Sequence, residues 1–245
     1  MRLLIDLGNT RLKWASSDPV WQVGAAALRG REIAELLNDT WRELPTPTAV
    51  FMVSVADRQA SEAIEQWVQA HWRLGVYRAL PQAEQLGVTN RYRDPATLGA
   101  DRWVALIGAH ATIANSAACV VDCGTAVTVD ALTAAGEFAG GIIFPGLGLL
   151  RQALTGGTAH IRASDGDESS CLARGTGDAV AAGSLYGLAG AIERVCEEFE
   201  QALGEPMKLL ITGGDADHLA AHLRRPARRI PDLVLRGLDR IAQTI

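Results

Sequence analysis

Two short strings decide the fold of this chain: Asp6-Leu7-Gly8-Asn9-Thr10 near its start and Asp122-Cys123-Gly124-Thr125-Ala126 near its middle. Each string closes a short apolar run, and a polar turn directly after such a run predicts a buried strand that ends there. The two aspartates are separated by close to half of the 245-residue chain. We therefore expect an internal duplication, which is architectural information that outweighs any single motif.

The sequence around both strings predicts the element order β-β-β-α-β-α twice, and hence mixed sheets with helices packed on them. In the first half the expected strands are 2–7, 11–16, 21–25 and 49–55, with helices at 32–43 and 57–72. In the second half they are 119–122, 125–131, 138–144, 208–212 and 233–235, with helices at 176–203, 215–223 and the C-terminus. We expect two similar lobes, residues 1–115 and 116–245, that face a central cleft and bring both Asp-Gly turns to it.

Composition excludes several classes of protein. Hydrophobic residues make up 48% of the chain and charged residues 21%, which is ordinary for a soluble globular protein. The net charge of −5 argues against a dedicated nucleic-acid binder. No apolar run approaches the roughly 18 residues of a membrane span, and no signal peptide is recognisable. The four cysteines have neither CxxC nor zinc spacing, so we expect free thiols in a reducing cytoplasm.

The two Asp-Gly turns have the chemistry of a phosphate and Mg²⁺ site. Glycine lets the backbone approach phosphate oxygens, and exposed N–H groups and threonine hydroxyls donate to them. The aspartate can hold a hydrated metal ion that offsets phosphate charge. Lys13, one of only two lysines, follows the first turn and could reach a phosphate as a point charge. The alternative is a pair of ordinary hairpins with an exposed lysine.

Two other segments carry candidate site residues. Leu98-Gly99-Ala100-Asp101-Arg102-Trp103 reads as a helix start, but Asp101 could also take a proton from a substrate hydroxyl while Arg102 binds an anionic group. Thr212-Gly213-Gly214-Asp215 follows a strand and opens a helix, so its backbone could pass close to an adenosine.

Three polar features favour structural interpretations. His218 and His222 have the i, i+4 spacing of zinc ligands but lack a third ligand, which favours surface histidines. The six arginines from Arg224 to Arg240 are typical of a solvated face or partner contact. The polar stretch Arg162 to Ser170 is typical of a mobile surface loop.

Taken together, the motifs resemble those of the type III pantothenate kinases, members of the acetate and sugar kinase/Hsp70/actin superfamily. The matching strings occur in family order and extend over essentially the whole chain: Asp6–Thr10 with Lys13, Gly99–Arg102, Asp122–Ala126, Gly140–Gly146 and Thr212–Gly214. The resemblance implies an α/β fold of duplicated ribonuclease H-like, or actin-like, lobes. It also implies ATP-dependent phosphorylation of pantothenate to 4′-phosphopantothenate, the first step of coenzyme A synthesis.

The resemblance assigns roles to individual residues. It implies Asp101 as the proton acceptor and Asp122 as the site of K⁺ or NH₄⁺, and Asp6 would hold Mg²⁺ through water. The ATP-binding residues would be Asp6, Gly8, Asn9, Thr10, Lys13, Thr125, Gly213 and Gly214. The pantothenate contacts would be Tyr92, Gly99, Ala100, Asp101, Arg102 and Thr176. The family also implies a homodimer whose pantothenate pocket the second subunit completes, with no nucleic acid and no membrane as partner.

The chain departs from the family where the long second-half helix begins. The usual Lys-Asn-Thr string reads Arg174-Gly175-Thr176 here, which weakens the assignment of Thr176. Three alternatives to the kinase stay open: another superfamily enzyme (a phosphotransferase on another small alcohol, or a polyphosphate phosphatase), a non-catalytic regulatory accessory protein, and a filament-forming actin-like protein. The Gly99–Arg102 string counts against the first, and the intact Asp6, Asp101 and Asp122 count against the second.

Overall fold

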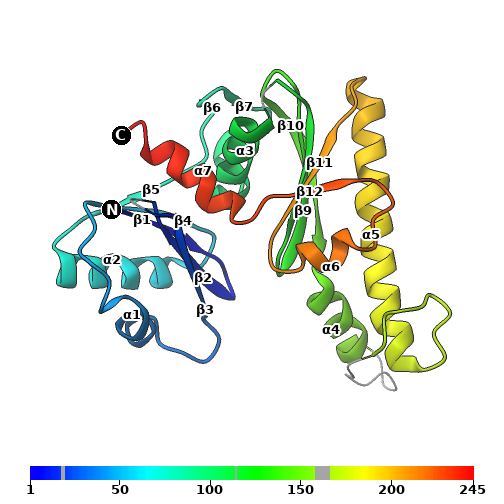
Figure 1. Ribbon diagram of the computed structural model, residues 1–245, viewed down its shortest axis with the longest axis horizontal. Helices are drawn as coiled ribbons and strands as arrows, with labels where there is room; N and C mark the ends of the chain where they lie inside the picture. Colours follow the sequence, from blue (N-terminus) through cyan, green and yellow to red (C-terminus); the bar gives the residue numbers. More distant parts are fainter. Residues whose placement is uncertain (18–19, 114, 158–165) are drawn as a thin grey trace. The chain divides into compact units, whose positions relative to one another are not determined.

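The computed structural model describes residues 1–17, 20–113, 115–157 and 166–245. The chain forms two compact units, Met1–Thr112 with Leu233–Ile245 and Ile113–Asp232. This division differs from the expected 1–115 and 116–245 in the placement of the C-terminal helix α7 (Leu233–Ala242), which packs on strands of the first unit. In Figure 1, α7 lies beside helix α3 (Ala100–Ile113) of the same unit.

The first unit is built on a five-stranded sheet whose strands stand in the order β3-β2-β1-β4-β5. β1, β2 and β3 pair antiparallel, whereas β4 and β5 run parallel to β1. Their bounds are Arg2–Leu7, Arg11–Ser16, Gln22–Ala27, Ala49–Ser54 and Val76–Arg78 for β1 to β5. The first four match the predicted strands, because each is a short apolar run bounded by turn residues.

Helices α1 (Ile33–Trp41) and α2 (Arg58–Trp72) cover one face of this sheet. Asp57 caps α2 by accepting a hydrogen bond from the Ala60 N–H at 2.7 Å, as its position before the helix predicted. Leu3, Ile5 and Leu7 of β1 point to this face and are fully buried with the helices. Since side chains alternate along a strand, Asp6 belongs to the opposite face, on which α7 packs.

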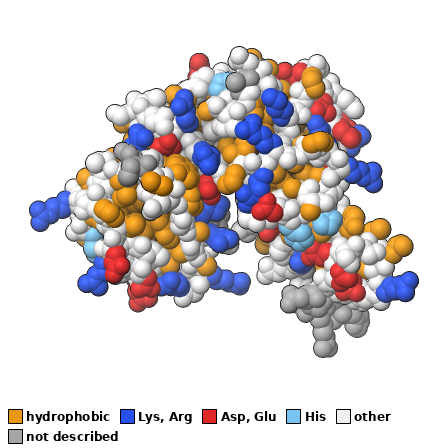
Figure 2. All heavy atoms as spheres, viewed as in Figure 1, with side chains coloured by type: hydrophobic (Ala, Val, Ile, Leu, Met, Phe, Trp, Pro, Cys, Tyr) orange, Lys and Arg blue, Asp and Glu red, His pale blue; other side chains and the backbone are white. Residues whose placement is uncertain are grey.

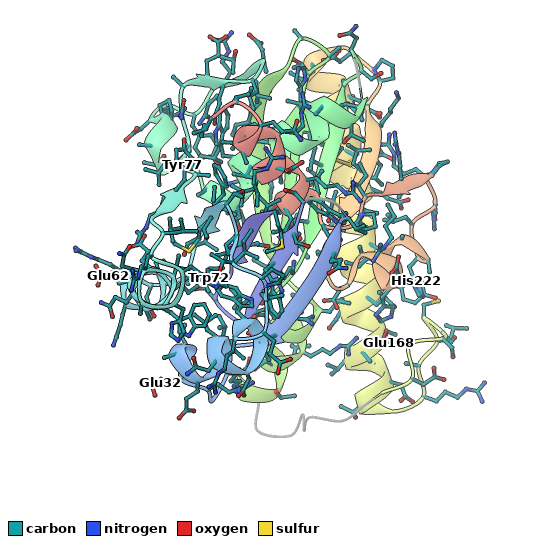
Figure 3. The ribbon with its side chains drawn as sticks, turned by 60° about the vertical axis from the view of Figure 1, so that its left-hand side comes forward. Glu32, Glu62, Trp72, Tyr77, Glu168 and His222 are labelled. Atoms are coloured by element: carbon teal, nitrogen blue, oxygen red, sulfur yellow. A yellow bond between two sulfur atoms is a disulfide. The ribbon has the colours of Figure 1, made fainter. Side chains whose placement is uncertain are left out.

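An aromatic cluster fills the space between α1, α2 and β2. Trp41 is fully buried, and the rings of Trp14, Trp67 and Trp72 lie 5.8–6.1 Å from it. Trp72, at the end of α2, is labelled in Figure 3. Edge-to-face and stacked ring contacts stabilise a fold beyond the effect of burying apolar area. This cluster therefore stabilises the strands that carry Asp6 and Lys13.

The second unit repeats the arrangement within a seven-stranded sheet, in which its strands stand in the order β10-β9-β8-β11-β12. β8, β9 and β10 pair antiparallel, whereas β11 and β12 run parallel to β8. The bounds are Ala118–Cys123, Ala126–Leu132, Glu137–Pro145, Lys208–Thr212 and Ala227–Arg229 for β8 to β12. Strand order and direction thus match those of the first unit, which confirms the duplicated α/β fold.

Helix α5 (Thr176–Leu203) has the predicted bounds and packs along the second sheet, with α4 (Leu147–Gly157) and α6 (Ala216–Ala220) next to it. α6 is shorter than the helix predicted at 215–223. α4, β5, β6 (Glu84–Gln85), β7 (Val88–Asn90) and the 3₁₀ helix η1 (Pro95–Thr97) had no sequence prediction. Of the expected loop Arg162–Ser170, residues 162–165 lie outside the described residues.

The strand predicted at 233–235 is wrong, because these residues form the first turn of α7. Three consecutive apolar residues do not distinguish a strand from a buried helix. Here Leu238 and Ile241 continue the buried face at helical spacing. The fifth strand is instead β12, within the arginine-rich segment, and Arg225 of that segment binds Glu200 at 2.8 Å. Part of the supposed solvated face is therefore used inside the fold.

The expectation that all cysteines are free thiols is also wrong. A disulfide joins Cys119 of β8 to Cys196 of α5, with their Cα atoms 6.0 Å apart, and Cys123 and Cys171 stay free. The pairing depends on the packing of α5 against β8, which cysteine spacing cannot reveal. In the described part of the chain, none of the helices combines the length and apolarity needed to cross a membrane.

Candidate functional site

The first Asp-Gly turn joins β1 to β2 and presents its polar groups to solvent. Asp6 and Lys13 stand opposite each other in the β1–β2 register, and the Lys13 Nζ lies 3.7 Å from the Asp6 Oδ2. The Gly8 N–H closes the turn on the Arg11 carbonyl at 3.0 Å, while Asn9 and Thr10 are exposed at its tip. The turn thus combines a nearly buried carboxylate, a lysine and exposed backbone, as phosphate binding requires.

The segment that opens α3 forms a second cluster in the same unit. The Asp101 Oδ1 accepts the Arg102 N–H at 2.7 Å, and the Arg102 Nη1 donates to the Tyr92 hydroxyl at 2.9 Å. The guanidinium carbon also lies 5.6 Å from the centre of the Tyr92 ring, within the range of a cation–π contact. Arg102 is only 7% exposed, so its guanidinium has a set position.

Asp101 has a perturbed protonation equilibrium. Burial raises the pKa of its carboxyl group above the ordinary value, although the Arg102 N–H, the Arg102 charge and Lys13 act in the opposite direction. A raised pKa makes the carboxylate a better proton acceptor than a solvated aspartate. Gly99 leaves room for this group, because a Cβ there would lie 2.8 Å from the Asp101 Oδ1.

The second Asp-Gly turn, between β8 and β9, has a similar backbone. The Gly124 N–H bonds the Ala126 carbonyl at 3.1 Å, and Thr125 is exposed. The connection between its strands is one residue shorter, and Thr128 stands opposite Asp122, where Lys13 stands opposite Asp6 in the first unit. The second turn therefore lacks the cross-strand lysine.

The glycine pair after β11 packs tightly on this turn. Gly213 has φ +99°, and a Cβ there would overlap the Cys123 carbonyl and lie 2.6 Å from the Asp122 Oδ1. The Asp215 N–H donates to the same Cys123 carbonyl at 3.0 Å. Only glycine fits this place, so the backbone of Gly213 and Gly214 is available at the edge of the turn.

The Cys123 thiol of the second turn is buried near two carboxylates. Burial, then Asp122 and then Asp215 raise its pKa well above the ordinary value. Among the described residues, no three His, Cys, Asp or Glu side chains gather in a metal-binding group. A Mg²⁺ ion would therefore depend on one carboxylate, waters and substrate phosphates, which is its usual manner of binding.

Thr176 is the first residue of α5 and is exposed. The end of the preceding loop is tied to this helix start, because the Asp178 Oδ1 accepts the Asp167 N–H at 2.9 Å. Within the same loop, Glu168 binds Arg151 of α4 and lies 2.6 Å from the His218 Nε2 of α6. Figure 3 shows Glu168 and His222 at this edge of the second unit. The described part of the loop is thus anchored by charged contacts.

One residue of the first unit was missed by the sequence interpretation. Asn90, at the end of β7, is 6% exposed and bonds the backbone on both sides of the Tyr92 loop. The string Asn90-Arg91-Tyr92 could have indicated this role, because an asparagine side chain commonly hydrogen-bonds the backbone two residues further along the chain.

Comparison with known proteins places these features in a family. The family model described as type III pantothenate kinase matches residues 2–198. A type III pantothenate kinase of Nitrosococcus oceani is 38% identical over 99% of this chain and 94% of its own. Another from Acidovorax ebreus is 41% identical over 98% and 95%. The crystal structure of a Baf-family protein of Campylobacter jejuni shares the fold, with a TM-score of 0.63, 21% identity and coverage of 99% and 98%.

Proposed function

The chain belongs to the type III pantothenate kinase family, and from this premise we propose which of its residues carry out each part of the reaction. The enzyme transfers the γ-phosphoryl group of ATP to pantothenate and so begins coenzyme A synthesis. Such a transfer depends on in-line positioning and on charge neutralisation more than on covalent chemistry of the protein.

Asp101 is the general base of this proposal. Its carboxylate takes the proton from the pantothenate hydroxyl as that oxygen bonds the γ-phosphorus and the bond to the ADP oxygen breaks. The observation that carries this role is the half-buried carboxylate with a raised pKa, next to an arginine that donates a hydrogen bond to Tyr92. Arg102 next to it carries a positive charge that would attract the pantothenate carboxylate.

Pantothenate is bound in this proposal by Tyr92, Arg102 and the backbone of Gly99 and Ala100. The absence of a side chain at Gly99 leaves space against the Asp101 carboxylate, where a Cβ would be too close. Thr176 at the start of α5 is a further contact. It is exposed, as a residue that completes the pocket of a second subunit would be.

Each unit carries its own set of proposed ATP contacts. In the first unit Gly8, Asn9 and Thr10 offer backbone and side-chain donors, Lys13 offers a positive charge, and Asp6 binds hydrated Mg²⁺. In the second unit Thr125 donates to a phosphate, and the Gly213-Gly214 backbone lies against the adenosine. Bound Mg²⁺ would neutralise phosphate charge, and K⁺ or NH₄⁺ at Asp122 would offset the negative charge of the second turn.

We also propose that the enzyme is a cytoplasmic homodimer. Between positions 183 and 190 the exposed residues of α5 are Gly183, Tyr186, Gly187 and Gly190, and the three glycines have open space beside them. Tyr186 on the same face is 41% exposed. Small residues let the helix of a second copy approach closely, and a buried tyrosine would add apolar area. A Gly187→Arg variant should sediment as a monomer, and an unchanged mass would exclude this face.

The reaction is tested by ADP release from Mg²⁺-ATP with and without pantothenate, in K⁺ and then in Na⁺ buffer. We expect release that depends on pantothenate and is faster in K⁺, with the K⁺ effect lost in Asp122→Ala. Release without pantothenate would indicate another acceptor or a hydrolase. No release from folded protein would favour the regulatory alternative.

A further inference from the structure

Asn90 occupies a buried position between the two segments that carry the proposed pantothenate contacts. It is the last residue of β7, and its own N–H donates to the Ala83 carbonyl at 2.8 Å. The side chain therefore starts from a backbone that is already held in place. At 6% exposure it is one of few buried polar residues of this unit, and a buried amide is stable only if its polar atoms are paired.

Both ends of the Asn90 amide have partners, and each partner belongs to a different part of the site. The Oδ1 accepts the Tyr92 N–H at 3.1 Å, which closes a turn around residue 91 and orients Tyr92. The Nδ2 donates to the Pro95 carbonyl at 3.2 Å. One side chain thus spans the whole loop from Tyr92 to the start of η1.

The Pro95 carbonyl extends this connection to the catalytic segment. It also accepts the Leu98 N–H at 3.3 Å, and a carbonyl oxygen can accept two such bonds. Leu98 directly precedes Gly99, whose carbonyl accepts the Trp103 N–H at 3.0 Å and so begins α3. Hydrogen bonds therefore connect Tyr92 through Asn90 and Pro95 to Leu98, and the chain continues from Leu98 into the segment that carries Asp101 and Arg102.

We propose that Asn90 is a positioning residue for pantothenate: its amide holds the Tyr92 loop and the Gly99–Arg102 segment at the separation that lets the Tyr92 hydroxyl meet the Arg102 guanidinium. It need not touch the substrate to do so. The inference rests on the proposed roles of Tyr92 and Arg102. The new element is that Asn90, which lies outside the Tyr92–Arg102 pair, sets the geometry of that pair and so affects the pantothenate KM.

The test is steady-state kinetics of Asn90→Ala with both substrates varied. Loss of the amide leaves the Tyr92 N–H and one Pro95 lone pair unbonded, so the pantothenate KM should rise by about 10-fold, as expected for one buried hydrogen-bonding group. kcat and the ATP KM should stay within about threefold of wild type, since this pattern reports lost substrate binding. Tyr92→Phe should raise the pantothenate KM by a smaller factor in the Asn90→Ala variant than in the wild-type enzyme, because both changes disturb the same Tyr92–Arg102 pair.

Asn38→Ala is the control for loss of an asparagine hydrogen bond elsewhere in the unit, because the exposed Asn38 accepts the Trp67 Nε1–H at 2.8 Å. Its pantothenate KM should equal that of wild type. If Asn90→Ala does not fold, Asn90→Ser takes its place, since a serine hydroxyl can accept the Tyr92 N–H but cannot span to Pro95. An unchanged pantothenate KM, or an equal loss in kcat and both KM values, would overturn the proposal. A wild-type enzyme without pantothenate-dependent ADP release would instead refute the proposed function.

Discussion

Replacement of Asp101 by asparagine is expected to slow the kinase and to stabilise the protein at the same time. The exchange removes the proton acceptor but leaves a side-chain oxygen that can still accept the Arg102 N–H. In the wild-type protein this N–H lies 2.7 Å from the Asp101 Oδ1. The start of α3 should therefore keep its geometry. A positioned general base contributes about 10²–10⁴ in rate, or about 3–5 kcal/mol of barrier, and kcat should fall by that factor.

The stability change follows from the sign of the pKa shift. Burial raises the pKa of Asp101, so the folded protein binds this proton more tightly than the unfolded chain does. The associated stability is present below the unfolded pKa and is lost as the pH rises through the folded pKa. At neutral pH the ionised carboxylate thus costs stability, and a neutral asparagine avoids this cost. Asp101→Asn should melt at a higher temperature than wild type at pH 7, with a difference that shrinks toward acidic pH.

The assay combines ADP release for kcat, calorimetry for ATP binding, and thermal melting between pH 4 and pH 7. Asp94→Asn is the control, because Asp94 is an exposed aspartate of the preceding segment and caps η1 through its Oδ1. It should change neither turnover nor melting temperature. Turnover of Asp101→Asn within a few fold of wild type would refute the base role. A lower melting temperature with lost ATP binding would refute the argument from burial.

Three further predictions concern the scaffold. Gly237→Ala places a Cβ against the α3 backbone and should lower the free energy of unfolding by about 1–3 kcal/mol in urea titrations, whereas Gly156→Ala, with open space beside it, should not destabilise. Gly213→Ala forces a side chain into φ +99°, a strain of about 1–3 kcal/mol, and should raise the ATP KM severalfold with little effect on the pantothenate KM. Thiol titration of the unfolded chain should count two groups before reduction and four after it; four at the outset would exclude the Cys119–Cys196 disulfide.

Charged side chains of both signs lie on one face of the protein. On the face drawn in Figure 2, Lys and Arg side chains are spread out with Asp and Glu side chains among them. Salt bridges such as Arg2–Asp239 and Arg225–Glu200 engage some of the arginines within the fold. Some of the arginines thus take part in contacts within the fold.

Much of the fold could be predicted from the sequence because its signals are local. β1, β2, β11 and α5 have the predicted bounds, since each is a periodic segment with turn or cap residues at its ends. The duplication was visible because the same turn follows two equivalent strands. The candidate residues of the Asp-Gly turns share this advantage, because a turn places its neighbours in sequence close together in space.

The remaining features depend on contacts between distant segments. α7 was predicted to begin as a strand, and only its packing on β1 and β4 of the first unit makes those apolar residues helical. α7 also packs on α3, where Gly237 and Gly108 approach each other closely, and neither glycine predicts this contact by itself. β5, β6 and β7 are too short to show a periodic pattern.

The sequence by itself determined the duplicated α/β fold, the two Asp-Gly turns and the family, because repeated patterns and short motifs are encoded in neighbouring residues. Only the tertiary structure decided that α7 belongs to the first unit, that Cys119 meets Cys196, and that Arg102 and Asn90 both hold Tyr92. The physical reason is that burial, pKa shifts and hydrogen bonds between separated segments arise from packing, and packing partners are chosen by the whole fold rather than by any one stretch of chain.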